Sequence, residues 1–191
     1  MRAHTSDHRL IVSGAALTAA KEAAESRIPR ETGGILIGFR SCKDVHVVDI
    51  VEVPDDRSTG SRFVLRENSR EAALARYLNQ VPPECPFGYV GSWHSHPTKA
   101  HASGRDLQTL YQEAKTAADF VAMVILIRSP ASTWEAEGAV GYRERAITRQ
   151  AGRSRPCRPR ISKVSLIVRS LDQPTPTGYG IPEGAGNDGS T

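Results

Sequence analysis

Two short motifs carry the side chains best suited to chemistry: GSWHSHP at residues 91–97 and SGRD at residues 103–106. Side chains at positions i and i+2 of a strand point to the same face, so a strand would place the imidazoles of His94 and His96 side by side. Asp106, in the first turn of a following helix, would add a carboxylate oxygen. Two nitrogens and one oxygen leave one position of a tetrahedral zinc ion for water, which is the arrangement of a catalytic site.

Each half of this pattern has a simpler interpretation when it stands alone. An H-x-H pair is weak support for a metal, and Ser103 followed by Asp106 also fits a capping box that satisfies the backbone at a helix start. A capping box does not explain the histidines, however, and both motifs fall within a short stretch of chain. His101, in the same loop, would close the site as a fourth protein ligand, so the predicted ligands are His94, His96 and Asp106.

The surrounding sequence predicts a strand, a loop and a helix around these motifs. Residues 87–96 are typical of a strand that ends at Pro97, and residues 103–116 have helical spacing of apolar side chains. The run 121–127 is apolar throughout, as in a strand buried at the centre of a sheet. The other predicted strands are 33–39 and 45–53, which would form an antiparallel hairpin, and 61–65, 133–137, 140–148 and 163–168, and the other predicted helices are 15–26 and 69–79.

A third segment completes a family resemblance. Glu31 begins the stretch ETGGILIG, and a distant glutamate ahead of H-x-H-P and S-x-x-D resembles the motif of the JAB/MPN (JAMM) zinc metalloprotease family. The resemblance covers roughly residues 10–148, although the loop between Pro97 and Ser103 is one residue shorter than in the common form. It implies an α/β fold of the α+β, cytidine-deaminase-like MPN type, with a mixed, largely antiparallel central sheet flanked by helices.

The same resemblance implies a reaction and assigns roles to two further residues. The reaction would be hydrolysis of an amide by water activated on one zinc ion (Zn2+) per chain. Glu31 would hold the water, accept its proton and pass it to the leaving amine. Ser103 would donate a hydrogen bond to the oxyanion of the tetrahedral intermediate. The chain would thus be a zinc metallopeptidase, with Glu31 and Ser103 as its catalytic residues.

Length and charge favour one catalytic domain. A chain of 191 residues has room for a single core of ordinary size, assigned to residues 1–150. Much of the net charge of +4 comes from an Arg/Pro-rich linker that leads to a short strand, together residues 151–172. Residues 173–191 are rich in Pro, Gly and Ser, have too few apolar side chains to form a core, and are predicted to be disordered. Because the basic residues form no recognisable nucleic-acid-binding module, we expect no nucleic-acid partner.

The apolar segments are too short for a membrane protein. No apolar run approaches the ~18 residues that span a bilayer, so no membrane partner is expected. Charges also interrupt the first 25 residues too often for the apolar core of a signal peptide. A cytoplasmic location follows, and the three widely spaced cysteines are not expected to form disulfides.

The expected substrate comes from the resemblance alone. It implies an isopeptidase or peptidase that cuts after the C-terminus of a ubiquitin-like protein, by deconjugation or precursor processing, with the extended tail added as a strand beside the site. A compact chain rich in Arg and Ala is typical of bacteria. The expected setting is therefore an operon with E1-like and E2-like partners, including antiphage systems, or one for sulfur-carrier maturation.

Two other classes of function remain as alternatives. A catalytically inactive MPN scaffold would bind protein partners without cleaving them, although all four motif residues are present. A cysteine enzyme could use Cys85, but no helix start follows to lower the pKa of its thiol. A zinc deaminase would need H-x-E with P-C-x-x-C, and neither occurs.

Overall fold

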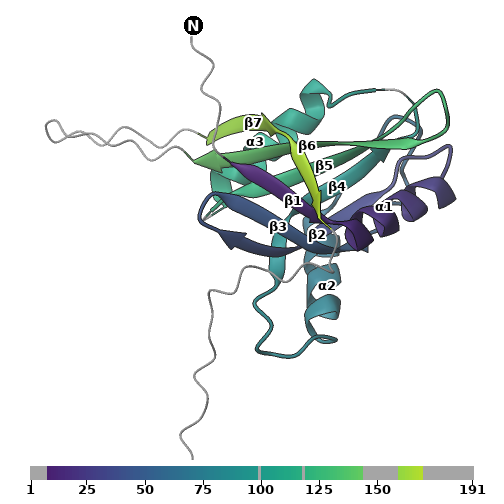
Figure 1. The fold of residues 1–191 in the computed structure, drawn as a ribbon. Helices are drawn as coiled ribbons and strands as arrows, with labels where there is room; N and C mark the ends of the chain where they lie inside the picture. Colours follow the sequence, from purple (N-terminus) through teal and green to yellow (C-terminus); the bar gives the residue numbers. More distant parts are fainter. Residues whose placement is uncertain (1–7, 99, 118, 144–158, 170–191) are drawn as a thin grey trace, which may run out of the picture.

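The computed structural model of the chain describes residues 8–98, 100–117, 119–143 and 159–169. Within these residues the chain forms eight strands and three helices (Figure 1). In chain order they are β1 (Arg9–Ser13), α1 (Gly14–Ser26), β2 (Gly33–Ser41), β3 (Asp44–Glu52), α2 (Glu67–Leu78), β4 (Gly88–His96), α3 (Gly104–Thr116), β5 (Val121–Arg128), β6 (Trp134–Arg143), β7 (Pro159–Val164) and β8 (Leu166–Arg169).

All eight strands belong to one mixed sheet in the order β7-β6-β5-β4-β2-β3-β1-β8. Four of the seven strand pairs are antiparallel, and β4 pairs with β5 and β1 with both β3 and β8 in parallel. The expected hairpin of β2 and β3 is present. This confirms the predicted α/β class with a mixed, largely antiparallel sheet flanked by helices.

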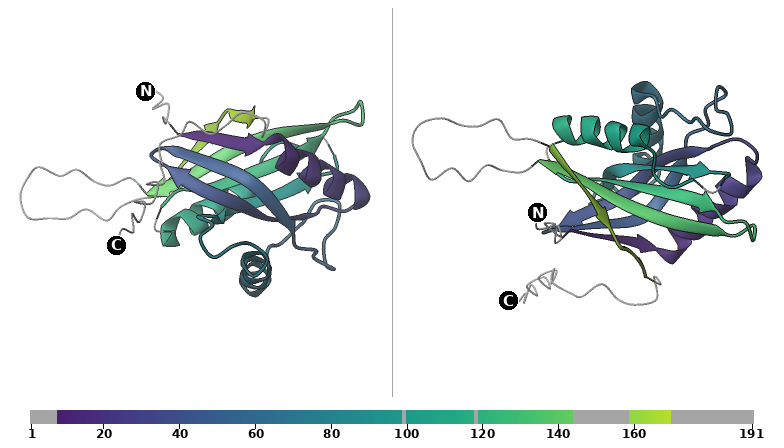
Figure 2. Two further views of the ribbon diagram at one scale, coloured as in Figure 1. Left: turned by 60° about the horizontal axis from the view of Figure 1, so that its bottom comes forward. Right: turned by 90° about the horizontal axis from the view of Figure 1, so that it is seen from above.

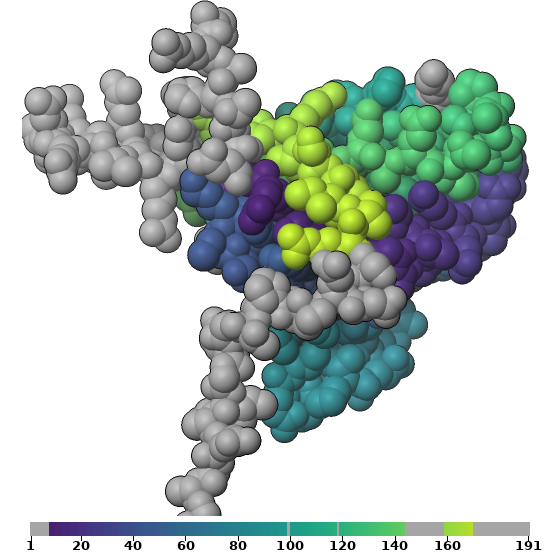
Figure 3. All heavy atoms as spheres, viewed as in Figure 1, coloured from purple at the N-terminus to yellow at the C-terminus, as the bar shows by residue number. Residues whose placement is uncertain are grey.

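The sheet curls until its two edges meet. The outermost strands, β7 and β8, are consecutive in the chain and only Ser165 separates them. Figure 3 shows this segment as a yellow-green band that crosses the surface between the green of β6 and the purple of β1. Closure of this kind leaves few unpaired strand edges exposed to other chains.

Different helices cover the two faces of the sheet (Figure 2). On one face, Ala16, Ala20 and Ala24 of α1 pack with Trp93 of β4 in the main core. On the other face, Leu110 of α3 packs against four alternate residues of β5, which are Val121, Met123, Ile125 and Ile127. The apolar run of β5 is therefore explained by burial on both faces, as predicted for a central strand.

Helix starts follow from local hydrogen bonds. The side chain of Ser13 accepts a hydrogen bond from the Ala16 backbone N–H at 3.0 Å and so begins α1. The small alanines at every fourth position of α1 let its backbone approach the sheet closely. The helices predicted at 15–26, 69–79 and 103–116 are all confirmed to within about two residues.

The strand predicted at residues 61–65 is wrong. Only an isolated bridge between Thr59 and Arg62 forms there, and residues 63–66 have no regular structure. The backbone N–H of Phe63 is instead directed to the carboxylate of Glu31. Because this donor serves the site, it is not available for a sheet ladder.

The predicted break between strands 133–137 and 140–148 is also wrong, because β6 runs without interruption from Trp134 to Arg143. Residues 144–148 lie outside the described part of the chain. A Cβ atom built on Gly138 would lie 2.9 Å from Leu10 Cδ2. Gly138 thus allows close packing inside the strand rather than ending it.

The ends of the chain differ from expectation in two further ways. Strand β1 was not predicted from the sequence, although its residues 10–13 are all buried. The strand predicted at 163–168 is divided at Ser165, because its two halves pair with β6 and β1 at opposite edges of the sheet. The division into a domain over residues 1–150 and a linker over 151–172 stays a prediction, and the predicted tail at 173–191 lies outside the described residues.

Among the described residues, none of the helices has the length and apolar character that crossing a bilayer requires.

Candidate metal centre

Strand β4 presents the two histidines on the face of the sheet that α3 covers. His94 pairs in register with Ile125 of β5, and His96 pairs with Ile127, and both isoleucines pack in the core beneath α3. Trp93, one position along, points into the opposite core. The period of two therefore places both imidazoles on one face, as the sequence predicted, and both histidines are buried.

The donor atoms of three side chains converge. The Nε2 atoms of His94 and His96 lie 3.1 Å apart. Asp106 places Oδ1 3.3 Å from His94 Nε2 and Oδ2 3.6 Å from His96 Nε2. One ligand atom from each residue lies within 4.8 Å of the other two, which is close enough for one metal ion.

These spacings fit zinc. Bonds of about 2.0–2.1 Å from a tetrahedral zinc ion place neighbouring donor atoms about 3.3–3.4 Å apart. The separations of 3.1, 3.3 and 3.6 Å lie around that value, although the last two end on different oxygens of Asp106. Two imidazole nitrogens and one carboxylate oxygen also form a donor set that zinc accepts, with a fourth position left for a small molecule.

The imidazole of His96 is oriented by a second hydrogen bond. Its Nδ1 lies 2.6 Å from the backbone carbonyl oxygen of Ala100. A carbonyl only accepts, so Nδ1 must carry the proton, and the lone pair of the neutral ring is then on Nε2. Backbone carbonyls play this orienting part for many metal-binding histidines.

Asp106 takes part in both of the arrangements that the sequence allowed. Its Oδ2 accepts a hydrogen bond from the Ser103 backbone N–H at 2.7 Å, and Ser103 Oγ accepts one from the Asp106 N–H at 3.2 Å, which is a complete capping box. Burial alone would raise the pKa of Asp106, but hydrogen bonds with His94 and Ser103 hold that pKa well below its usual range. The carboxylate is therefore ionised and available to a cation.

Glu31 reaches the same place from a different part of the chain. It precedes β2, and its backbone N–H donates to the Thr59 carbonyl at 2.8 Å. The next residue, Thr32, donates from its N–H to Ser95 Oγ at 3.0 Å and accepts from the Ser95 N–H at 2.8 Å. These bonds fix Glu31 beside β4, with Oε1 3.9 Å from His96 Nε2.

The environment of Glu31 suits proton transfer. Its side chain is 8% exposed. Burial raises the pKa of Glu31 to about 7, against the opposing effects of His96, of the Phe63 backbone hydrogen bond and of the Arg105 charge. A carboxyl group with a pKa near neutrality can both accept and release a proton under ordinary conditions.

A close approach of two strands also depends on Gly33. A Cβ atom at this position would lie 2.3 Å from the Trp93 carbonyl oxygen, 2.6 Å from Phe63 Cε1 and 2.9 Å from the His94 Cβ. No larger residue fits without movement. The glycine beside Glu31 therefore sets the distance between that segment and the histidines.

The remaining candidates from the sequence are placed as follows. Ser103 is exposed, and its hydroxyl accepts from Asp106, so the hydroxyl hydrogen is directed elsewhere. His101 hydrogen-bonds to Glu137 and does not join the three converging ligands. Cys85 precedes β4, whereas the histidines lie at the other end of that nine-residue strand. The structure therefore does not bring the thiol to them.

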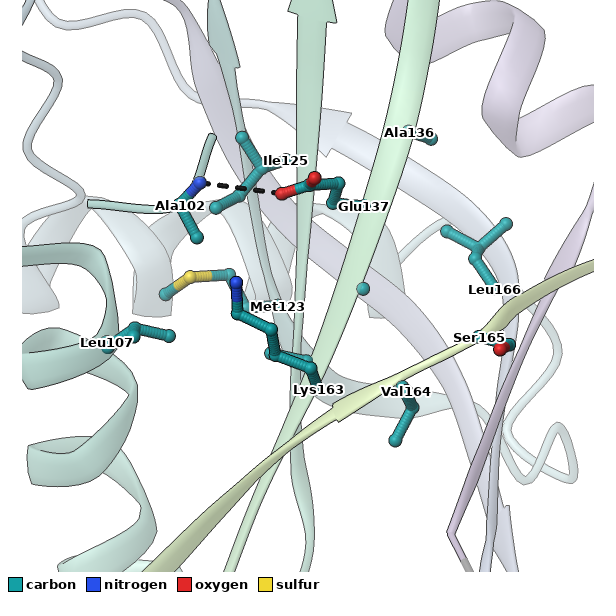
Figure 4. A pocket seen from close by; sticks show the side chains of 12 residues that line it. Ala102, Leu107, Met123, Ile125, Ala136, Glu137, Lys163, Val164, Ser165 and Leu166 are labelled. Atoms are coloured by element: carbon teal, nitrogen blue, oxygen red, sulfur yellow. Dashed lines mark hydrogen bonds between the residues drawn. The ribbon is translucent and has the colours of Figure 1, made fainter. Parts of the chain in front are cut away.

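A cavity of about 250 Å³ opens on the same face of the sheet (Figure 4). Ala102 and Leu107, which flank the segment of Ser103 and Asp106, form one side of it. The other lining residues come from β5, β6, β7, β8 and the residue between the last two strands, and they are Met123, Ile125, Ala136, Glu137, Gly138, Ala139, Lys163, Val164, Ser165 and Leu166. Most of this lining is apolar.

Three residues that contact the segments of the candidate site were not predicted from the sequence: Phe63, Ser95 and Glu137. Their roles arise from contacts between segments far apart in the chain, such as the 63 positions between Thr32 and Ser95. Ser95 had one available signal, because a polar residue that points to the core beside two histidines must find a partner. The other two had none.

Comparisons with known proteins agree with this geometry. The family model described as prokaryotic homologs of the JAB domain matches residues 14–137. Among solved structures, the solution structure of protein DSY2949 from Desulfitobacterium hafniense is similar, with a TM-score of 0.58 and 14% identity. The alignment covers 84% of this chain and 93% of that one, and at this identity it supports the fold alone. No curated protein matches the sequence.

Proposed function

Because the chain belongs to the prokaryotic homologs of the JAB domain, we propose that it is a zinc-dependent peptidase or isopeptidase of the JAMM type. The observation that carries the proposal is the convergence of His94, His96 and Asp106 within 4.8 Å, with the buried Glu31 3.9 Å from one of them. These are the groups that metal-assisted hydrolysis of an amide requires.

The proposed mechanism assigns one role to each group. A zinc ion held by His94, His96 and Asp106 would supply an activated water and a positive charge that polarises the substrate carbonyl. Glu31 takes the proton from the attacking water and delivers it to the leaving nitrogen as the carbon–nitrogen bond breaks. The buried position of Glu31, with Oε1 3.9 Å from His96 Nε2, supports both halves of this transfer.

Ser103 is proposed to donate its hydroxyl hydrogen to the developing oxyanion. The hydroxyl lies at the first turn of α3, next to Asp106 in the capping box. The hydroxyl oxygen accepts from the Asp106 N–H, which leaves its hydrogen available to a group outside the helix. Removal of one donor of this kind costs about 3 kcal/mol of transition-state stabilisation in other hydrolases.

The proposed substrate is the C-terminal tail of a ubiquitin-like protein, in an amine-linked conjugate or a precursor. An extended tail with small last residues suits a site at the end of a strand. The apolar cavity beside Leu107 offers room for a side chain that precedes the scissile bond. Sulfur carriers form a second class of tail for the same site. The bacterial setting, E1-like and E2-like partners and cytoplasmic location stay predictions.

The test is a cleavage assay with matched fusions. A ubiquitin-like protein ending in Gly-Gly is linked through its last residue to a lysine side chain or a following peptide, and a second fusion carries bulky residues in place of the glycines. We expect cleavage of the first fusion only, and none after removal of metal by a chelator. Bound zinc without cleavage of any fusion would favour the inactive scaffold, and cleavage after chelation would contradict the metal mechanism.

A further inference from the structure

The loop between β4 and α3 must hold the metal ligands at the right separation. It connects His96, the last residue of β4, to Ser103, the N-cap residue of α3, which precedes Asp106 by three positions. Any shift of residues 100–102 therefore moves the carboxylate of Asp106 relative to the two imidazoles. On one side, this segment is held by the bond from His96 Nδ1 to the Ala100 carbonyl.

On the other side, one carboxylate contacts the next two residues. Glu137 Oε1 hydrogen-bonds to His101 Nδ1, and Oε2 accepts from the Ala102 backbone N–H at 3.4 Å. Figure 4 shows the second of these bonds along the wall of the cavity. A single side chain on β6 thus contacts both residues that come immediately before Ser103.

Glu137 is well placed for this role. It pairs in register with Ile125 of β5, which pairs in turn with His94 of β4. The three side chains share one face of the sheet, and two strand spacings separate Glu137 from His94, or about 10 Å. The rigid sheet that carries the histidines therefore also carries the group that holds the loop.

The carboxylate is charged, which strengthens both bonds. Burial alone would raise the pKa of Glu137, but hydrogen bonds from His101 and Ala102 outweigh it, and the charges of His101 and Lys163 act in the same direction, so its pKa lies below the usual range. Hydrogen bonds to ionised acceptors are roughly twice as strong as those between neutral groups.

We propose that Glu137 is a positioning residue of the metal centre, which holds residues 101 and 102 so that Asp106 meets His94 and His96. The inference rests on the proposed metal site and not on the identity of the substrate. Outer-shell partners of metal ligands typically contribute 10–100-fold to metal affinity. Glu137 acts through the loop, so its contribution should appear in zinc affinity as well as in turnover.

The experiment measures zinc affinity by competition with a chromogenic chelator, using the full chain and five proteins. Glu137→Ala removes both bonds. Glu137→Gln keeps one oxygen acceptor, and His101→Ala keeps the bond from the Ala102 N–H. Glu135→Ala is the matched control, because Glu135 lies on the same face of β6 two residues away, is exposed, and makes no side-chain hydrogen bond among the described residues.

We expect Glu137→Ala to weaken zinc binding by about 10–100-fold, with smaller losses in Glu137→Gln and His101→Ala and none in Glu135→Ala. The visible spectrum of the cobalt-substituted protein should change only where the loop is released. Equal zinc affinity in Glu137→Ala and Glu135→Ala would overturn the positioning role of Glu137 but not the metal centre. If Glu137→Ala does not fold, the other two variants decide, and wild-type affinity in both would overturn it equally. A wild-type chain that binds no zinc would overturn the metal centre itself.

Discussion

At the scale of single residues, the candidate site includes a carboxyl group that is buried, where its charged form is disfavoured. Glu31 is 7% exposed, and burial raises its pKa to about 7. A buried carboxylate is costly unless it is paired. The protein tolerates this because the Phe63 N–H, His96 and Arg105 favour the charged form.

Replacement of Glu31 by glutamine separates metal binding from proton transfer. Glutamine keeps the shape of the side chain but cannot accept a proton, so zinc should remain and turnover should fall by a factor of about 100 or more. The measurement is a single-turnover cleavage rate together with metal content. Glu22→Gln, an exposed substitution on α1, serves as the control. Near-normal turnover in Glu31→Gln would remove this residue from the mechanism.

The residues of the site could be predicted because their types and spacing are local. His94, His96 and Asp106 converge as the sequence indicated, and the capping box explains why Ser103 and Asp106 occur three positions apart. Partners from other strands, such as Glu137, could not be predicted. Their meaning depends on the register of β6 against β5, which the sequence alone does not define.

At the scale of elements, the approach of β2 to β4 fixes the position of Glu31. Gly33→Ala would place a Cβ atom 2.3 Å from the Trp93 carbonyl and 2.9 Å from His94 Cβ. We expect a loss of about 1–3 kcal/mol in the free energy of unfolding, the usual cost of overpacking, together with reduced activity.

The matched control is Gly104→Ala, at the first residue of α3, where a Cβ atom meets nothing within 4 Å. That substitution should be neutral or stabilising by about 0.4–1 kcal/mol, because alanine restricts the unfolded chain. Urea denaturation of both variants gives the comparison. A Gly33→Ala protein as stable and active as Gly104→Ala would show that the close approach is not required.

Elements were predictable where their apolar pattern was long and regular. β4, β5 and all three helices follow from periodicity and capping. The errors occur where a tertiary contact outweighs local preference. The Phe63 N–H bonds to Glu31 instead of to a neighbouring strand, and Gly138 leaves space for the side chain of Leu10. Ser165 separates two strands that pair at opposite edges of the sheet. Each of these depends on tertiary contacts that a single segment does not reveal.

At the scale of the whole molecule, the closed sheet should depend on its last strand. Leu166 is partly buried against the main core, whereas Val168 is 51% exposed on the same strand. Leu166→Ala should lower the free energy of unfolding by about 1–2 kcal/mol, a fraction of the cost at a fully buried site. Val168→Ala should change it by less than about 0.5 kcal/mol. Thermal unfolding of the two variants tests this, and equal stability would mean that β8 does not close the sheet in solution.

The most direct test of the central claim is the zinc content of purified, dialysed protein, measured by elemental mass spectrometry. A site with three protein ligands should hold about one zinc ion per chain. His94→Ala, His96→Ala and Asp106→Ala should each lose most of that metal, because a three-ligand site does not readily lose a ligand. Glu31→Gln should keep it. A wild-type chain without zinc, or full zinc in all three ligand variants, would contradict the metal centre on which the proposed function depends.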